Sequence, residues 1–386
     1  MTTTNPIRFS DTKPHYELLD GLRGVAALLV VVYHIFEGFA FAESTNGGGS
    51  GLITTFNHGH TAVDFFFILS GFVIAYAYDD RWGRMTVGGF FKRRLIRLQP
   101  MLVLGAILGA LSFMISGCLR WDGATTPIGW VMVAFAMMIF MIPAVPGVGY
   151  DVRGFGEMFS LNGPAWSLFF EYIGNILYAI FIRRLSTKRL TCLAVVLAIL
   201  HTWFFVGNVS EYNSVGVGWT LNTINFCGGM VRMLFPFTVG MLLARTFKPC
   251  KVRGAFGMCS VMLIAIFAVP YLGDAERISV NSLYEVVCIA AVFPAIVWLG
   301  ASGVSENKIT KRVNKFLGEI SYPLYIIHYP VMYLFYMWLI NNHYYGLEDT
   351  LFAPALVVCV SVILAYASLK LYDEPLRRWL IKKIFK

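Results

Sequence analysis

Two side chains that a hydrocarbon interior should reject, Arg23 and His34, lie within one apolar run at residues 18–42. They are eleven positions apart. Because a helix turns about 100° per residue, both would leave the same face, roughly 16 Å apart along the axis. An arginine at the centre of a membrane-spanning helix costs about 2.5–3.5 kcal/mol. The pair therefore favours a polar cavity in which an imidazole exchanges protons. The alternative is an arginine that reaches the interface beside a packed histidine.

Carboxylates occur inside two other apolar runs. Asp64 lies about one turn into the second run, at a depth like that of His34, and could hold the imidazole. The alternative is a carboxylate that the helix dipole favours at a helix N-terminus. Glu171 shares a helix face with Asn175 in the fifth run and needs a partner or a proton. Arg232, which is also intramembrane, could be that partner.

Two further clusters could bind or steady a ligand. Arg94 and Arg97 are three residues apart at one boundary of the third run, so that they share a helix face. Paired guanidiniums suit a phosphate-bearing ligand, but by spacing alone a topological signal with anionic-lipid contact is the better explanation. Tyr325 and His328 are one turn apart in a late apolar run and could steady an oxyanion. Ser70, beside Gly71, could simply permit close helix packing.

The elements that position these residues are predicted to be membrane helices. The chain has 386 residues, of which 57% are hydrophobic and only 14% charged, with a mean hydropathy of +0.65. Apolar runs of helix length fall at about 18–42, 61–78, 98–117, 127–144, 164–182, 190–207, 223–244, 255–271, 280–300, 317–340 and 351–371. These values exclude a soluble domain with one anchor and indicate a polytopic membrane protein.

The basic residues give the predicted orientation. Of the 31 Lys and Arg, 24 cluster in five segments, at 79–97, 183–189, 245–253, 308–315 and from Lys370 onward. The positive-inside rule places these segments in the cytoplasm, so the net charge of +9 reflects topology and not nucleic-acid binding. The seven isolated cysteines suggest packing residues and no disulfide framework.

An even number of crossings is required if both chain ends are cytoplasmic. We therefore expect an all-α fold, a polytopic membrane helical bundle of about 10 transmembrane helices plus one re-entrant or interfacial segment. That segment is either 98–117 or 127–144, and the Gly- and Pro-rich stretch 143–163 could form a cap over a cavity. Residues 1–386 are expected to form a single domain, with 1–16 as a cytoplasmic N-terminal segment and 372–386 as a basic cytoplasmic tail.

Several motifs are absent. The glycine-rich stretch 47–51 lacks the Lys-Ser/Thr of a phosphate-binding loop, and there is no H-E-x-x-H. His58 and His60 have no evident third ligand. No metal site and no permanently bound cofactor are predicted.

Taken together and in order, the motifs resemble the acyltransferase 3 family of integral-membrane O-acyltransferases over about residues 16–380. The resemblance is carried by Arg23 with His34, Val63–Phe72, the Arg94/Arg97 pair, Trp166–Glu171, Leu317–His328 and Glu374–Arg377. It implies transfer of an acyl group, usually acetyl, from cytoplasmic acyl-CoA (acetyl-CoA) as co-substrate to a hydroxyl of an envelope polysaccharide or other glycan. It also implies a multi-pass protein of the bacterial cytoplasmic (inner) membrane that is in contact with membrane lipids. Both termini are expected in the cytoplasm.

The resemblance and the residues together suggest roles. Some family members carry an extracytoplasmic esterase-like domain that this sequence lacks, so a second transfer step would need a separate partner.

A proton-coupled or lipid-linked-sugar transporter would also need intramembrane His, Arg, Asp and Glu, but no internal repeat is visible. The expected catalytic residues are His34, Arg23, Asp64 and Glu171, the donor-binding residues are Arg94 and Arg97, and the supporting residues are Ser70, Trp166, Tyr325 and His328.

Overall fold

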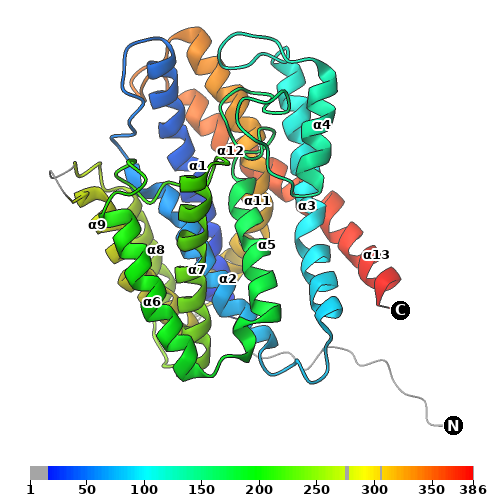
Figure 1. Ribbon diagram of the computed structural model, residues 1–386, viewed down its shortest axis with the longest axis vertical. Helices are drawn as coiled ribbons and strands as arrows, with labels where there is room; N and C mark the ends of the chain where they lie inside the picture. Colours follow the sequence, from blue (N-terminus) through cyan, green and yellow to red (C-terminus); the bar gives the residue numbers. More distant parts are fainter. Residues whose placement is uncertain (1–15, 274–277, 305–306, 386) are drawn as a thin grey trace.

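A computed structural model describes residues 16–273, 278–304 and 307–385, which form a helical bundle without strands (Figure 1). The α-helices are α1 (Glu17–Thr45), α2 (Ala62–Tyr78), α3 (Val87–Ile115), α4 (Ile128–Ile139), α5 (Ala165–Ile180), α6 (Thr187–Val206), α7 (Thr223–Thr246), α8 (Ala255–Phe267), α9 (Val280–Val287), α10 (Phe293–Ser302), α11 (Lys308–Asn342), α12 (Phe352–Ser368) and α13 (Glu374–Ile384). Short 3-10 turns are η1 (Asn57–Thr61) and η2 (Ile182–Arg184), and π-helical turns are η3 (Cys288–Val292) and η4 (Leu369–Asp373). The predicted all-α class is confirmed.

Within the described residues, nine helical segments are long and apolar enough to cross a membrane. The short helix α8 adds a tenth passage between the two ends of the bundle. Before α8, Val252 N–H donates to Ser302 O, at the end where α1 begins. After α8, Tyr271 N–H donates to Thr54 O, in the loop that follows α1. The described residues therefore make ten passages, nine by bilayer-length helices and one by the 13-residue α8, which agrees with the prediction of about ten.

The segment that does not cross is 127–144. Its helix α4 has 12 residues and packs along α3, so that it does not run from one end of the bundle to the other. α4 starts beside the C-terminal end of α3, where Leu119 and Thr125 form an isolated bridge. It ends where the Gln99 side chain donates to Ile139 O (2.5 Å). From there the chain turns back through the irregular stretch 140–164, which we call the cap (Figure 1). Phe155, Glu157 and Gly163 of the predicted cap 143–163 line a cavity.

The helices around the site pack closely through glycines. A Cβ on Gly71 of α2 would lie 2.0 Å from Phe237 O of α7, and one on Gly240 of α7 would lie 2.0 Å from Ile68 O of α2. Neither position can hold a larger residue without separating the two backbones. This reciprocal contact fixes α2, which carries Asp64 and Ser70, against α7, which carries Arg232.

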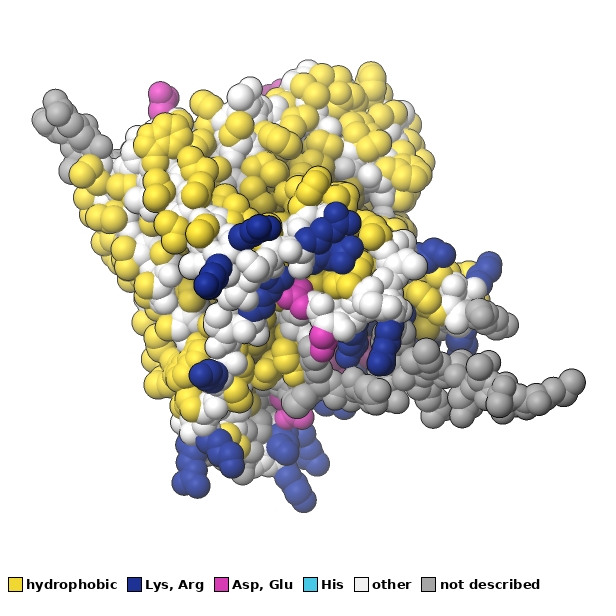
Figure 2. Space-filling model, turned by 60° about the horizontal axis from the view of Figure 1, so that its bottom comes forward, with side chains coloured by type: hydrophobic (Ala, Val, Ile, Leu, Met, Phe, Trp, Pro, Cys, Tyr) yellow, Lys and Arg dark blue, Asp and Glu magenta, His cyan; other side chains and the backbone are white. Residues whose placement is uncertain are grey.

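One end of the bundle is basic. The segments after α2, α5 and α7 are tied there by Arg245, which donates to Asp79 Oδ2 (2.7 Å) and to Leu185 O (2.7 Å), and Val252 N–H after α7 donates to Ser302 O at the end of α10. Figure 2, in which this end comes forward, shows Lys and Arg side chains gathered around it. The clustered basic segments of the sequence therefore share one end in space.

The two chain ends are only partly described. Residues 1–15 of the expected N-terminal segment lie outside the described residues, and α1 begins directly after Tyr16. In the expected tail 372–386, Tyr372 and Asp373 still belong to the π-helical turn η4, and α13 follows. Arg93 lies over the ring of Phe385 at 4.4 Å, so the tail returns to the basic end of α3.

Candidate active site

Two cavities lie inside the bundle, one toward each end. The arginine cavity, whose space together with its opening to solvent is about 790 Å³, is lined by residues of α1, α2, α3, α5 and α11, including Arg23, Arg94 and Arg97. The histidine cavity, about 1420 Å³ together with its opening to solvent, is lined by His34 and by residues of the cap and of the loops opposite the basic end. The residues common to both linings are Val63 and Tyr325. The cavities therefore meet at one level of the bundle.

The arginine cavity holds an ion pair that neutralises only part of its charge. Arg94 Nη2 donates to Glu171 Oε1 at 2.6 Å, and Ser70 Oγ donates to the same oxygen at 2.8 Å. Arg97 lines the same cavity and forms no ion pair with any described residue, and Arg23 has a longer contact with Asp20 (3.4 Å). Three guanidiniums face one carboxylate in this lining, so the cavity attracts an anion.

His34 in the other cavity is held by a carboxylate that sequence reasoning missed. His34 Nδ1 lies 2.6 Å from Glu37 Oε2. Tyr336 Oη donates to the same carboxylate oxygen and to His34 O, both at 2.8 Å. An ionised carboxylate only accepts, so Nδ1 carries the proton and Nε2 keeps its lone pair. The arrangement suits an imidazole that accepts a proton at Nε2.

The predicted pairings of Asp64 and Arg232 are wrong. Arg232 Nε and Nη2 donate to the two oxygens of Asp64 at 2.9–3.1 Å, and both side chains are buried. Arg232 also donates to Val217 O and His60 O and lies 5.1 Å from the Trp166 ring. Asp64 therefore neither holds His34 nor leaves Arg232 free for Glu171. The pair instead fixes the loops that border the histidine cavity.

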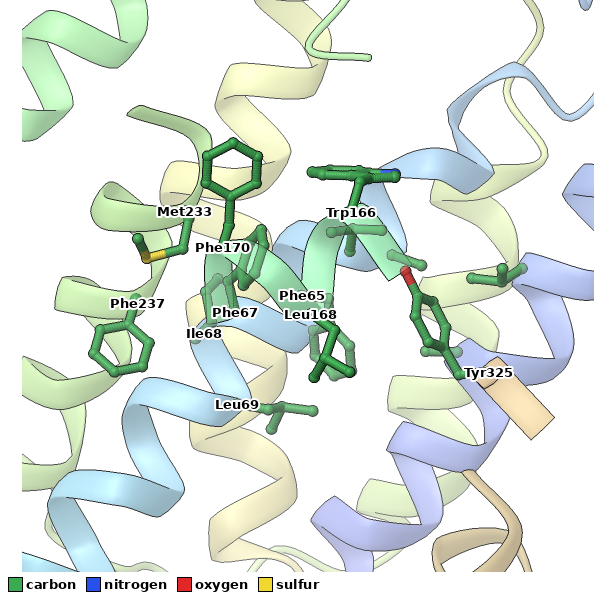
Figure 3. Packing of buried hydrophobic residues seen from close by; sticks show 14 of the residues in the cluster. Phe65, Phe67, Ile68, Leu69, Trp166, Leu168, Phe170, Met233, Phe237 and Tyr325 are labelled. Atoms are coloured by element: carbon green, nitrogen blue, oxygen red, sulfur yellow. The ribbon is translucent and has the colours of Figure 1, made fainter. Parts of the chain in front are cut away.

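Tyr325 and Trp166 lie where α11 and α5 approach each other (Figure 3). The Tyr325 hydroxyl is 2.7 Å from Ser167 Oγ. Trp166 lines the histidine cavity, whereas Ser167, the next residue, lines the arginine cavity. Tyr325 is thus the hydroxyl donor placed at the level where the two cavities meet.

His328 packs against His34, with ring centroids 5.3 Å apart. Its Nδ1 lies 3.0 Å from Leu324 O, a carbonyl that only accepts, so Nδ1 carries the proton. Nε2 of the neutral ring is then an acceptor, and it has no partner among the described residues. Because Nε2 of a neutral His328 has no hydrogen, it cannot donate to an oxyanion. Tyr325 is then the remaining candidate for stabilising the oxyanion.

Two further histidines share one buried carboxylate. His58 Nδ1 and His60 Nε2 lie 2.9 and 3.1 Å from Glu285 Oε1. Ser214 Oγ and Val215 N–H also donate to Glu285 Oε2. No group of three or more potential metal ligands occurs in the described part of the chain. The cluster ties η1, the 207–222 loop and α9 together at the border of the histidine cavity.

The cap contributes a second carboxyl group to this cavity. Glu157 Oε2 accepts a hydrogen bond from Tyr333 Oη at 2.8 Å. The guanidinium of Arg153 lies 3.5 Å from the Tyr333 ring centroid. Burial raises the pKa of Glu157 to about 8. At neutral pH this carboxyl is mainly protonated and can both donate and accept hydrogen bonds at the cavity surface.

Comparison with known proteins identifies the family. The family model of the acyltransferase 3 acyltransferase domain matches residues 16–370. "Protein 2 in picA locus" of Rhizobium radiobacter is 34% identical over 194 residues, covering 47% of this chain and 91% of that protein. "Acyltransferase MdmB" of Streptomyces mycarofaciens is 27% identical over 323 residues, covering 81% of this chain and 78% of that protein.

A protein of Staphylococcus aureus (strain COL) that is named as an O-acetyltransferase is 24% identical over 399 residues. The alignment covers 95% of this chain but only 58% of that protein. No solved structure matches the chain. Because the family model covers most of the sequence, the chain belongs to the acyltransferase 3 family and is a membrane O-acyltransferase.

Proposed function

We propose that the protein transfers an acetyl group from cytoplasmic acetyl-CoA to a hydroxyl of an envelope glycan. The observation that carries the proposal is the pair of cavities that meet at Val63 and Tyr325, one lined by arginines and the other by a carboxylate-held histidine. A charged donor and a neutral hydroxylated acceptor would thus reach one reaction centre from opposite ends of the bundle. Family membership favours this enzyme over a transporter.

The donor would bind with its phosphates at Arg94 and Arg97. These side chains lie near the basic end, and Arg23 continues the positive lining along α1. The pantetheine arm would follow this cavity and bring the thioester to the level of Tyr325. The Arg94–Glu171 pair would set the direction of the Arg94 guanidinium.

The acyl transfer would then take place beside His34. The acceptor oxygen forms a bond with the thioester carbonyl carbon, and its proton passes to His34 Nε2. The carbon–sulfur bond breaks, and the thiolate of CoA takes up the proton from the imidazolium. Glu37 keeps Nε2 available as the base, and the Tyr325 hydroxyl would turn its hydrogen from Ser167 Oγ to the oxyanion of the tetrahedral intermediate, with its ring in place.

Comparison of envelope glycans tests this function. Glycans from cells with and without the gene would be treated with mild base, and the released acyl groups identified. Acetate released only from cells with the gene supports the proposal. Identical acyl content in both strains would refute it.

The proposed donor entry requires the basic end to face the cytoplasm of a bacterial inner membrane, with both termini on that side. In a variant without its seven native cysteines, we expect single cysteines at exposed Gly48, Glu211 and Tyr345 to react with an impermeant thiol reagent in intact cells. Single cysteines at exposed Thr187 and Arg312 should react only after permeabilisation. Labelling of position 187 in intact cells would reverse the proposed orientation.

Replacement of both Arg94 and Arg97 by Gln should weaken acetyl-CoA binding by about 10-fold or more, because hydrogen bonds to charged groups contribute about 1.5–3 kcal/mol each. Binding by the parent protein should weaken as salt is added. Isothermal titration of the solubilised protein measures both effects. A matched control is Lys311→Gln with Arg312→Gln, which removes two exposed cations at the same end. An equal loss of acetyl-CoA affinity in both double variants would mean that Arg94 and Arg97 act only through the general positive charge of this end.

A further inference from the structure

We propose that the layer of side chains between the two cavities selects the acyl group by size, admitting acetyl and excluding longer chains. We call this layer, formed by Val63, Phe66, Ser167 and Tyr325, the septum. The inference rests on the proposed function, because it concerns the acyl group of the same donor. It specifies which acyl-CoA the protein would use and which side chains determine the choice.

The septum residues come from α2, α5 and α11, and the change from one cavity to the other on α1 lies near the same level. On α1 the lining changes from the arginine cavity at Arg23 to the histidine cavity at Val30. On α5 it changes between Ser167 and Trp166. On α2 and α11, Val63 and Tyr325 belong to both linings. The acyl group at the tip of a donor bound in the arginine cavity would therefore meet these side chains first.

Tyr325 cannot easily move aside to widen the septum. Its side chain is buried, and its hydroxyl is bonded to Ser167 Oγ (2.7 Å) and lies 3.4 Å from Pro164 O. Figure 3 shows this hydroxyl pointing toward the first turn of α5, where Trp166 lies. The Phe66 ring packs against the Tyr325 ring edge-to-face, with centroids 5.6 Å apart and an interplanar angle of 84°. Rotation of Tyr325 would break both contacts at once.

The walls beside the acyl group are apolar. Val63 contributes two methyl groups and Phe66 an aromatic ring to the lining, and both suit the methyl group of acetyl. A butyryl group carries two more methylenes, and if the septum keeps its shape these would extend into the histidine cavity, where the acceptor would bind. Protein interiors are packed so densely that one additional methylene changes the energy of packing. Pocket discrimination of one methylene is typically about 10-fold or more.

Binding of acyl-CoA to the full-length solubilised protein tests the septum without any acceptor. The dissociation constants of CoA, acetyl-CoA and butyryl-CoA would be measured for the parent protein, Val63→Ala and Val63→Leu. The matched control is Val73→Ala, which removes the same two methyl groups from α2 in the arginine cavity, ten residues away from the septum. Size-exclusion chromatography confirms that each variant is folded.

We expect the parent to bind acetyl-CoA about 10-fold or more tightly than butyryl-CoA, as pocket discrimination of methylenes implies. Val63→Ala should bring this ratio close to one, Val63→Leu should increase it, and Val73→Ala should leave it unchanged whatever its effect on affinity. An unchanged ratio in both Val63 variants, or an equal change in Val73→Ala, would overturn the size selection alone. A parent protein that binds neither CoA nor acetyl-CoA would overturn the proposed function itself.

Discussion

His34→Ala should lower the rate of acyl transfer by about 10²–10⁴-fold, the usual contribution of a general base. The variant should still bind acetyl-CoA, because the arginines lie in the other cavity. It should also remain folded, since polar contacts between membrane helices contribute only about 0.6 kcal/mol on average. Acyl-group analysis of glycans, together with acetyl-CoA titration of the purified variant, measures the two effects separately.

His201 supplies a matched control for this prediction. It is a buried histidine in α6 whose ring nitrogens have no partner among the described residues, and it lines neither cavity. His201→Ala should keep the parent rate. The rate of acyl transfer by Glu37→Gln should lie between the rates of His34→Ala and His201→Ala. The pH profile of the reaction should also shift, because the amide no longer stabilises the imidazolium. Near-parent transfer by His34→Ala would refute the general-base assignment.

The second large effect is expected at Asp64. Asp64→Ala leaves the Arg232 guanidinium buried without its carboxylate, a change that typically destabilises a protein by about 3–5 kcal/mol. The variant should show a lower thermal unfolding midpoint in detergent and little folded protein in membranes. Activity would fall for that reason and not through the loss of a catalytic group.

A double replacement distinguishes the two explanations. Asp64→Leu with Arg232→Met removes both charges, and exchanges of this kind are often neutral for stability. The double variant should therefore regain most of the unfolding midpoint that Asp64→Ala loses. If Asp64→Ala is as stable as the parent but inactive, Asp64 has a catalytic role after all. An unfolding midpoint that the double replacement does not restore would contradict the ion-pair explanation.

The helices were largely predictable because apolar runs of bilayer length have few alternative structures. The even number of crossings follows from placing both chain ends in the cytoplasm, and the structure identifies α4 as the helix that does not cross. Two boundaries moved: α3 begins at Val87 and α11 at Lys308, each about ten residues before its apolar run. An apolar run marks only the part of a helix that lies in hydrocarbon, and the helix continues into the basic loops without an apolar pattern.

The partners of the charged residues were far less predictable. The positions of Asp64 and His34 within their apolar runs predict similar depths in the membrane. These positions do not show that Asp64 faces Arg232 on α7. Arg232 is a possible partner of Glu171 from the sequence, but in the structure Glu171 pairs with Arg94 of α3. These choices depend on helix rotation and neighbour order, which one sequence does not encode in any local pattern.

Glu37 and Glu285 illustrate the two ways in which a residue was missed. Glu37 is three positions after His34, and this spacing places both on one helix face, so the signal was present in the sequence. Glu285 lies 227 positions from His58, and only the fold brings them together. Local spacing can therefore suggest the partner of a catalytic residue, but long-range partners need the structure.

The central claim is that an acyl group passes from a donor at the basic end to an acceptor at the opposite end through His34. Sealed right-side-out membrane vesicles, loaded with acetyl-CoA labelled in the acetyl group, test it directly. We predict base-labile label on the glycan when acetyl-CoA is inside the vesicles, and none with His34→Ala. The absence of label with the parent protein, or label that forms only when acetyl-CoA is added outside, would contradict the account.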